Sequence, residues 1–339
     1  MSLALPGPVA VMGAGSVGCY VGGCLQAVGA QVHFIGRPRV LGALRSHGLT
    51  LTDLHGSHTR LEAAQLHLHD APQDLAAAQS PALVLLCVKS GGTAEAAAAL
   101  AGQVRPGTPV LSLQNGVDNV QAAETLAPSL RWLPGMVPFN VAELGPGQYH
   151  RGTFGELAVQ DDGALSPWLP LFQSAGLPLA RHRDLLPVQW GKLLLNLNNP
   201  VNALSGLPLR AELLDRNCRT VFAALQDEAL AALHAAGIAP TRLTPLPATR
   251  LPALLRLPTP LFRLAAARML KIDDKARSSM ADDLALGRPT EVDAICGAVV
   301  RLAHQHGLNA LRNARMVELL SVPQPQPQDG AALRRLLGL

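Results

Sequence analysis

Lysine and aromatic residues are scarce in this sequence of 339 residues. Only 3% of the residues are Phe, Trp or Tyr, and the lysines stand at four positions, 89, 192, 271 and 275. The remaining positive charge comes from scattered arginines, and the formal net charge is only +4. A nucleic-acid-binding protein typically has clustered basic residues accompanied by aromatic ones. The composition therefore predicts no nucleic-acid partner.

Paired cysteines and long apolar runs are also missing. The five cysteines form no CxxC motif, and most lie in apolar runs, as small buried residues do. No uninterrupted apolar run approaches the ~18 residues that a membrane span needs. Residues 1–15 lack the charged start of a signal peptide and contain Pro and Gly. We therefore expect a reduced, cytoplasmic protein without a disulfide framework or a membrane contact.

The chain has the composition of a globular protein with two domains. Hydrophobic residues make up 48% and charged residues 15%, and a chain of this length exceeds one ordinary core. The first half alternates short apolar runs with helical patterns: strands at 8–13, 30–36, 82–90 and 109–116, and helices at 16–28 and 93–101. Further strands around one helix are predicted between 131 and 180. This alternation is typical of a doubly wound α/β domain.

The character of the sequence changes near residue 183. Helical periodicity follows at 184–204, 209–237, 260–286 and 290–306, with a short helix ending at 320. A Pro/Gln segment, 321–330, predicts an extended linker before a short helical end. We therefore predict a Rossmann-type dinucleotide-binding domain over 1–182, an all-α substrate-binding and catalytic domain over 183–320, and a linker and C-terminal tail over 321–339.

A glycine-rich motif follows the first predicted strand and opens the first predicted helix. Its pattern is G-x-G-x-x-G, which is weak alone but specific in this strand–turn–helix context. The first glycine permits a tight turn, the second lets the backbone approach a pyrophosphate, and the third allows close packing of helix and strand. The helix N-terminus favours the negative charge of the pyrophosphate. The predicted cofactor-binding residues of this motif are Gly13, Ala14, Gly15, Ser16, Val17 and Gly18.

The end of the second predicted strand favours NADP(H) over NAD(H). NAD-binding enzymes place Asp or Glu there to hold the ribose 2′-hydroxyl. This sequence reads HFIGRPR instead, with no acid but with Arg37 and Arg39. A guanidinium group matches the shape and charge of a 2′-phosphate. The other interpretation is two surface arginines in a loop.

Polar residues follow two more buried strands, at the edge where open α/β sheets bind ligands. Lys89 follows one strand and would reach a cofactor phosphate or ribose. Asn115, in the LQNG sequence after the next strand, would reach the nicotinamide ribose or the substrate. The alternatives are a strand-terminal lysine and an ordinary Asn-Gly turn.

Four blocks of sequence together resemble the ketopantoate reductase (2-dehydropantoate 2-reductase) family. The blocks are GAGSVG, LQNGVDN, WGKLLLNLNNPVNAL and SSMADDLALGRPTEVDAICG, and the resemblance runs from about residue 8 to 320. The glycine block is generic, whereas the last two blocks are particular to the family. The resemblance implies NADPH-dependent reduction of ketopantoate to (R)-pantoate in pantothenate and coenzyme A biosynthesis.

The resemblance also assigns roles to individual residues. Lys192 would be the catalytic general acid, and Asn196 would bind the substrate. Ser279 would contact the substrate carboxylate. Glu291 would lie beside the reacting oxygen or a substrate hydroxyl, as a second catalytic residue that also belongs to the cofactor site. Arg37, Lys89 and Asn115 match cofactor-side positions of the family, and Asp283 matches an acidic position of the SSM helix.

The sequence departs from the family pattern at one point. The family usually has a second asparagine eight residues after the lysine, followed by proline, whereas here position 200 is itself proline. The nearest match is Asn199-Pro200, which implies a deletion of one residue in the helix. Spacings of three and four residues share a helix face, so Asn199 would still reach the substrate while Asn198 points elsewhere.

The residues themselves support this chemistry but permit plainer interpretations. Hydride transfer to a ketone generates an alkoxide, and a lysine ammonium on a rigid helix can stabilise that charge and supply the proton. Lys192 could instead extend from a helix start to solvent, Ser279 could bond within its own helix, and Glu291 could be an ordinary acid in the first turn of a helix capped by Thr290.

The leading hypothesis is an NADP(H)-dependent oxidoreductase that acts on a branched 2-oxoacid, with Lys192 as proton donor. The alternatives are a related 2-ketoacid reductase with another substrate and a non-catalytic NADPH-binding sensor protein. We expect a small-molecule substrate, no metal, and a monomer or homodimer.

Overall fold

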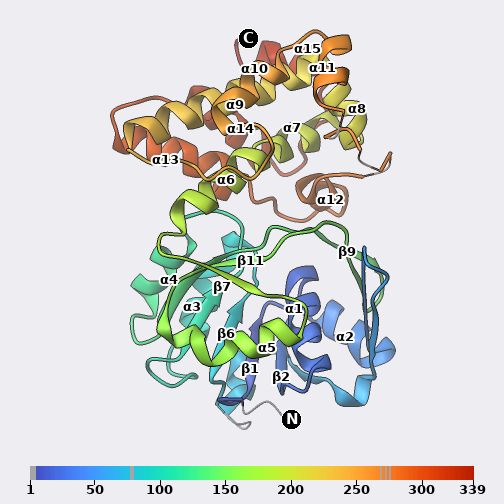
Figure 1. Cartoon of the computed structure of the whole chain (residues 1–339), viewed down its shortest axis with the longest axis vertical. Helices are drawn as coiled ribbons and strands as arrows, with labels where there is room; N and C mark the ends of the chain where they lie inside the picture. The colour runs from blue at the N-terminus through green and yellow to red at the C-terminus, as the bar shows by residue number, and fades with distance from the viewer. Residues whose placement is uncertain (1–4, 77–79, 268, 272, 275) are drawn as a thin grey trace. The chain divides into compact units, whose positions relative to one another are not determined.

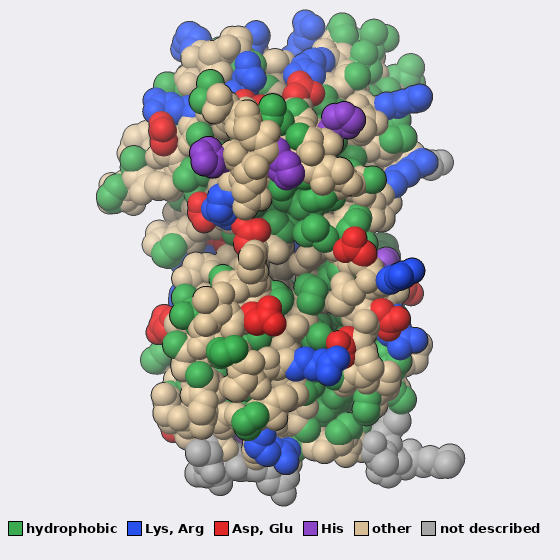
Figure 2. All heavy atoms as spheres, turned by 90° about the vertical axis from the view of Figure 1, so that its left-hand side faces the viewer, with side chains coloured by type: hydrophobic (Ala, Val, Ile, Leu, Met, Phe, Trp, Pro, Cys, Tyr) green, Lys and Arg blue, Asp and Glu red, His purple; other side chains and the backbone are tan. Residues whose placement is uncertain are grey.

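The computed structural model describes residues 5–76, 80–267, 269–271, 273–274 and 276–339. The chain forms two compact units, Met1–Leu185 and Leu186–Leu339, called here the first and second units (Figure 1). Within the described residues, no helix is both long and apolar enough to cross a membrane. On the face drawn in Figure 2, acidic and basic side chains are interspersed on each unit.

The first unit is built on a sheet of eight strands in the order β12-β11-β8-β7-β6-β1-β2-β5. All neighbours in this sheet pair in parallel except β8 and β11, which are antiparallel. The six strands β5-β2-β1-β6-β7-β8 follow the 3-2-1-4-5-6 order of the dinucleotide-binding fold, which confirms the predicted Rossmann-type domain. The strands are β1 (Val9–Met12), β2 (Val32–Ile35), β5 (His67–His69), β6 (Leu83–Leu86), β7 (Pro109–Ser112), β8 (Arg131–Met136), β11 (Leu157–Gln160) and β12 (Leu179–His182).

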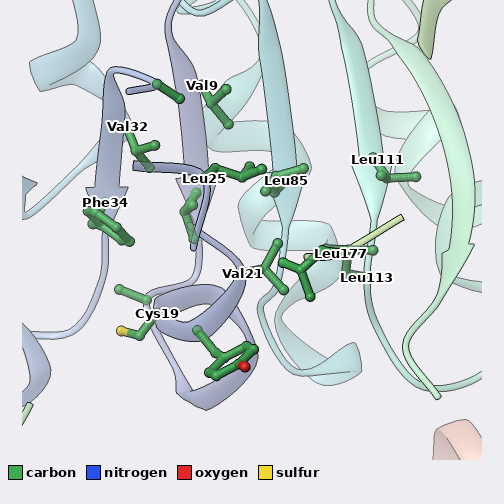
Figure 3. Close-up of a cluster of buried hydrophobic side chains, with 14 of the residues drawn as sticks. Val9, Cys19, Val21, Leu25, Val32, Phe34, Leu85, Leu111, Leu113 and Leu177 are labelled. Atoms are coloured by element: carbon green, nitrogen blue, oxygen red, sulfur yellow. The ribbon is translucent and has the colours of Figure 1, made fainter. Parts of the chain in front are cut away.

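Helices cover both faces of this sheet, because successive side chains of a strand point to opposite faces. Leu83 and Leu85 of β6 lie in one apolar cluster, and Val84 and Leu86 lie in another. The first cluster includes the apolar side of α1, as Figure 3 shows for Leu25 beside strand residues. Each fully buried Val or Leu contributes roughly 1.5–3 kcal/mol. The helices of this unit are α1 (Ser16–Ala27), α2 (Pro38–His47), α3 (Thr93–Leu100), α4 (Asn119–Leu126) and α5 (Leu169–Ser174).

A second sheet of four strands, in the order β4-β3-β10-β9, packs against α1. Two of its strands fall between 131 and 180, where strands were expected, but the hairpin of β3 and β4 was not predicted. In β3 Leu49 and Leu51 are buried while the residues between and after them are half-buried, so one face of the strand contacts the core. The strands are β3 (Leu49–Asp53), β4 (His58–Leu61), β9 (Val141–Gly145) and β10 (Gln148–Arg151).

The regular elements of the second unit, within its described residues, are all helices, as the sequence predicted. Its longest helix is α9, and α10, α13, α14 and α15 all pack against it. The helices are α6 (Leu186–Asn196), α7 (Asn198–Ser205), α8 (Leu209–Leu214), α9 (Arg216–Ala235), α10 (Leu251–Leu255), α11 (Thr259–Ala265), α12 (Ser279–Ala285), α13 (Ala298–Gln305), α14 (Leu311–Ser321) and α15 (Gly330–Leu336).

Three of the four long helices predicted for this unit are interrupted, so those three predictions were wrong in detail. The helix predicted at 184–204 breaks at Leu197, and the one at 209–237 breaks at Asp215, whose carboxylate caps α9 by accepting from the backbone of Asn217 and Cys218. The prediction at 260–286 covers two short helices, because Ser278 caps a new helix, α12. The fourth helix, predicted at 290–306, starts with a π-helical turn, Asp293–Gly297.

The C-terminal tail belongs to the second unit and packs against α9. At the end of the extended Pro/Gln segment, the backbone N–H of Gln328 donates to the Leu204 carbonyl (2.8 Å). Asp329 caps α15, and Leu333 is fully buried. Arg334 Nη1 donates to Asn217 Oδ1 (3.1 Å). The tail is thus part of the helical core rather than a loose extension.

Candidate active site

The glycine motif forms the turn from β1 into α1 and the first turn of that helix. Gly13 has φ +107°, and a Cβ there would lie 2.5 Å from the backbone nitrogen of Val88. Gly18 packs against the same turn, since its Cβ would lie 2.2 Å from the Gly13 carbonyl oxygen. A Cβ on Gly15, in contrast, would meet nothing within 4 Å. The first and third glycines are therefore required by the fold, and the second leaves open space in front of α1.

This open space suits an anionic group. Gly15 is the N-cap of α1 and offers no side-chain acceptor to the first turn of the helix. A helix N-terminus carries a partial positive charge and backbone N–H donors, which together bind phosphate. The twelve residues of α1 and the absence of a Cβ at Gly15 fit the pyrophosphate of a dinucleotide.

The end of β2 contacts the glycine turn and separates the two arginines. The backbone N–H groups of Gly13 and Ala14 both donate to the Ile35 carbonyl (3.0 and 2.8 Å). Arg39 forms a two-pronged ion pair with Glu143 of β9 (2.9 and 3.1 Å). Arg37 is exposed at the start of α2, and within the described residues it makes no ion pair. Arg37 is therefore the arginine whose guanidinium is available to a ligand at this edge.

The ends of β6 and β7 are tied together by side-chain hydrogen bonds. Gln114, which is buried, donates to the Val88 carbonyl (3.0 Å) and to Thr93 Oγ1 (2.7 Å). The Ser90 hydroxyl donates to the Asn115 carbonyl (2.9 Å). Lys89 and Asn115 are both half-buried. This network fixes the two loops that carry them at the carboxyl ends of the strands.

Lys192 lies on α6 and is half-buried. Burial lowers the pKa of Lys192 from its ordinary value of 10.5 to about 8, and the nearby Glu291 carboxylate opposes that effect. Glu291 directly precedes the helix that begins at Val292, so Thr290, the cap in the plainer interpretation, stands one residue too early to be the N-cap. The π-helical turn follows immediately, and π-helical turns occur often at functional sites. An ammonium group with a lowered pKa beside a carboxylate is well placed for proton transfer near neutral pH.

The four asparagines that follow Lys192 divide into two pairs. Asn198 and Asn202 are buried and serve the fold: Asn198 donates to Glu212 Oε2 (2.9 Å), and Asn202 donates to the Leu207 carbonyl (2.9 Å). Asn202 Oδ1 also accepts from the backbone N–H of Ser278 (2.9 Å). Asn196 and Asn199 are half-buried, and their side-chain amides bond to no described residue.

The SSM segment provides one serine to the fold and presents the other to solvent. Ser278 is buried, caps α12 by accepting from the Ala281 N–H (3.1 Å), and donates to the Asn199 carbonyl (3.3 Å). Ser279, the residue expected to contact the substrate carboxylate, is the exposed first residue of α12. Asp283 is buried on the same helix. Through Ser278, α12 is fixed to α7, the helix that carries Asn199.

Sequence reasoning missed the residues that hold the candidate site in place. Gln114, Asn202 and Ser278 lie within the family blocks, and Glu212 lies outside them, but none of the four was assigned the buried hydrogen bonds that the structure shows. Ser278 alone carried a usable signal, because a serine directly before an apolar helix is a common N-cap. The partners of Asn198 and Asn202 lie on other helices, so spacing along the chain could not identify them.

The chain matches two family models that together cover most of its length. Residues 9–163 match "Ketopantoate reductase PanE/ApbA", and residues 184–324 match "Ketopantoate reductase PanE/ApbA C terminal". A 2-dehydropantoate 2-reductase of Halobacterium salinarum is 28% identical over 307 residues, covering 88% of this chain and 93% of that protein.

Solved structures give the same picture. A PanE/ApbA family ketopantoate reductase from Ralstonia eutropha JMP134 is 27% identical with a TM-score of 0.76, and 98% of each chain is covered. D-mandelate dehydrogenase in complex with NADH and anilino(oxo)acetate shares the fold at 19% identity, with a TM-score of 0.74 over 98% of this chain and 100% of that one. The fold, the glycine turn and both matched regions place the chain in the ketopantoate reductase PanE/ApbA family.

Proposed function

We propose that the protein reduces a branched 2-oxoacid with NADPH, and that the substrate is 2-dehydropantoate, which becomes (R)-pantoate in pantothenate biosynthesis. The observation that carries the proposal is the set of polar groups on one helical segment of a family member: an ammonium with a lowered pKa, Lys192, followed by the side-chain amides of Asn196 and Asn199. The names of the relatives, 2-dehydropantoate 2-reductase, agree with this substrate.

In the proposed reaction, each group of the chain has a separate task. The glycine turn and α1 would hold the pyrophosphate, and Lys89 and Asn115 would contact the ribose or phosphate groups. When bound, the nicotinamide supplies a hydride to C2 of the oxoacid. Lys192 Nζ stabilises the developing alkoxide and donates the proton that completes the hydroxyl group. Glu291 keeps the Lys192 ammonium protonated, since its carboxylate raises the pKa of that lysine.

The proposed preference for NADPH rests on the different surroundings of two neighbouring arginines. Arg39 already pairs with Glu143, whereas Arg37 has its guanidinium exposed beside the glycine turn. We expect Arg37→Ala to raise KM for NADPH by at least about tenfold, since a charge-assisted hydrogen bond contributes about 1.5–3 kcal/mol, and to leave KM for NADH nearly unchanged. Arg39→Ala is the matched control. An equal rise for both cofactors in Arg37→Ala would contradict the assignment.

The proposed substrate contacts come from the amides that the fold does not use. Asn196 and Asn199 would donate to the hydroxyl and carboxylate of the oxoacid, and Ser279 would contact the carboxylate. Asp283 and Glu291 add acidic groups that would exclude a dianionic substrate. These contacts fit a small oxoacid that also carries a hydroxyl group.

A related 2-oxoacid reductase with another substrate is the second candidate. The observation that favours it is the spacing of the second asparagine, because Asn199 stands seven residues after Lys192 instead of eight, beside the break at Leu197. D-mandelate dehydrogenase, which shares the fold, was solved with NADH and anilino(oxo)acetate. A change in the spacing of the asparagines would alter which oxoacid side chain fits.

The test is NADPH oxidation by the purified protein with a panel of 2-oxoacids at equal concentrations. We expect kcat/KM for 2-dehydropantoate to exceed that for oxoacids without the distal hydroxyl and for aryl oxoacids by at least about tenfold. A higher kcat/KM for another oxoacid would assign the protein to the second candidate. NADPH binding without turnover of any oxoacid would favour a sensor protein instead.

A further inference from the structure

A fully buried carboxyl group of the second unit lies on α8, which packs against α7, the helix that carries Asn198, Asn199 and Asn202. Glu212 of α8 has no exposed surface, and α8 packs against α7 and α9. Its Oε2 accepts a hydrogen bond from Asn198 Nδ2 (2.9 Å). Glu212 Oε1 and Asn198 Oδ1 are also buried, and within the described residues neither oxygen has a hydrogen-bond partner. Two groups joined by one bond thus each retain one unsatisfied oxygen.

The neighbouring cation, Arg219, forms no ion pair with this carboxyl group among the described residues. Arg219 of α9 is fully buried, but its guanidinium donates to three backbone carbonyls and a hydroxyl group. Burial is the main cause that raises the pKa of Glu212; the Asn198 hydrogen bond and the Arg219 charge oppose it, and the Asp215 carboxylate adds to it. The Cys218 thiol also lies near Glu212. A buried carboxylate with one hydrogen bond and no ion pair would be costly, by several kcal/mol in a typical protein interior.

We propose that Glu212 is a neutral carboxylic acid that forms a two-hydrogen-bond ring with the Asn198 amide and thereby positions the substrate-binding segment. In this ring Asn198 Nδ2 donates to Glu212 Oε2, and the acid proton on Glu212 Oε1 donates to Asn198 Oδ1. A single proton therefore satisfies both of the oxygens that otherwise lack a partner. No charge is left in the core of the unit.

The ring acts at the point where the helix is interrupted. Asn198 is the first residue of α7 and directly follows the break at Leu197. The break separates α6, which carries Lys192 and Asn196, from α7, which carries Asn199. Its side chain ties this point to α8, and Ser278 ties the Asn199 carbonyl to α12. Glu212 is therefore a positioning residue for Asn196 and Asn199, a role that rests on the proposed function.

The ring makes the unit sensitive to pH in a defined direction. An exposed glutamate has a pKa near 4.3, and burial raises the pKa of Glu212 to about 8. Between these values the folded protein holds one proton more than the unfolded chain, so stability falls as the pH rises. Above about pH 8 the proton is lost, and two acceptors face each other across the ring. A glutamine at position 212 would keep both hydrogen bonds and remove the titration.

The first experiment measures thermal unfolding of the full chain from pH 5.5 to 9 for the wild type and Glu212→Gln. We expect Glu212→Gln to be at least as stable at every pH and to gain on the wild type steadily up to about pH 8. Glu228→Gln is the matched control, because Glu228 accepts from Arg312 and Asn313 as a carboxylate, so its neutralisation should destabilise the protein. If the unfolding temperatures of the wild type and Glu212→Gln change with pH in parallel, the proposal that Glu212 is a neutral acid is wrong.

A second measurement observes the proton directly. The infrared difference spectrum between the wild type and Glu212→Gln at pH 6 should contain the carbonyl band of a protonated carboxylic acid, and that band should disappear as the pH is raised past about 8. A carboxylate band at pH 6 would contradict the proposal. Neither this measurement nor the unfolding curves require turnover, so failure of the ring and failure of the proposed reductase activity are distinguishable.

The positioning role is tested by comparing the KM for the oxoacid with the KM for NADPH. Glu212→Leu removes the ring and should raise KM for the oxoacid by at least about tenfold while KM for NADPH is unchanged, since a displacement of ~1 Å in a binding group can cost up to ~10²-fold. Glu212→Gln should restore the wild-type KM. A normal oxoacid KM in a folded Glu212→Leu protein would show that Glu212 does not position the asparagines.

Discussion

Replacement of Lys192 by methionine is expected to stabilise the protein while strongly lowering its kcat. Methionine has a similar length and fills the same space on α6 without a charge. Lys192 is half-buried, and burial lowers its pKa from 10.5 to about 8, so the folded protein holds this ammonium at a cost. In the unfolded chain the ammonium is hydrated and this cost is absent.

The size of the effect follows from the lowered pKa. The difference between 10.5 and about 8 is ~2.5 pH units, and each unit corresponds to about 1.4 kcal/mol, which gives ~3 kcal/mol. Because Lys192 is not fully buried, solvent screening reduces the expected gain to about 2 kcal/mol at pH 7. Between pH 8 and 10.5 the unfolded chain binds more protons than the folded protein, so the wild type becomes more stable as the pH rises.

The assay is urea unfolding of the wild type and Lys192→Met at pH 7 and pH 10. We expect Lys192→Met to be more stable by about 2 kcal/mol at pH 7, with the difference largely gone at pH 10. Lys271→Met is the control, because Lys271 is exposed and its replacement should change stability little at either pH. A Lys192→Met protein that is no more stable at pH 7, or a difference that does not change with pH, would refute the reasoning.

Three further predictions concern other parts of the molecule. Gly15→Ala should leave stability unchanged but weaken NADPH binding, measured by cofactor fluorescence, because the new Cβ occupies the open space before α1. Gly13→Ala, in contrast, should prevent folding. Normal NADPH affinity in Gly15→Ala would place the pyrophosphate elsewhere. Leu333→Ala should cost about 2–5 kcal/mol in urea unfolding, since this side chain is fully buried between the tail and α9, and a loss below ~1 kcal/mol would show that the tail is dispensable. Asn202→Ala should lower the free energy of unfolding by about 2–3 kcal/mol, because it leaves two buried partners unsatisfied. Asn196→Ala should raise the oxoacid KM with little loss of stability. The opposite pair of results would show that Asn196 serves the fold and Asn202 the substrate.

The fold of the first unit could be predicted because its signals are local. Apolar runs such as 82–90 identify strands buried on both faces, and the G-x-G-x-x-G spacing identifies the turn into α1. The hairpin of β3 and β4 escaped prediction because β4 has a single buried apolar residue, Leu61, so only β3 carries an alternating apolar pattern. Its stability comes from packing against distant elements, which a local pattern does not contain.

The roles of the candidate site residues stay predictions, and the side chains that support those residues were not predicted. The family pattern indicated Lys192, Asn196 and Glu291, and helical spacing separated Asn198 from the other two asparagines. The reason for that separation, a bond to Glu212 on another helix, depends on tertiary contacts and was not predictable. The break at Leu197 was equally hidden, although the shift of proline to position 200 indicated that the helix had changed there.

We propose that Lys192 donates the proton in an NADPH-dependent reduction of 2-dehydropantoate. The most direct measurement is kcat for this reaction, followed by NADPH oxidation at saturating substrate, in the wild type and in Lys192→Met, with cofactor affinity measured separately. We expect turnover by the wild type, a loss of about 10²–10⁴ in kcat in Lys192→Met, and unchanged NADPH affinity in both. A folded Lys192→Met protein with wild-type kcat, or a wild type that binds NADPH but does not turn over 2-dehydropantoate, would contradict the account.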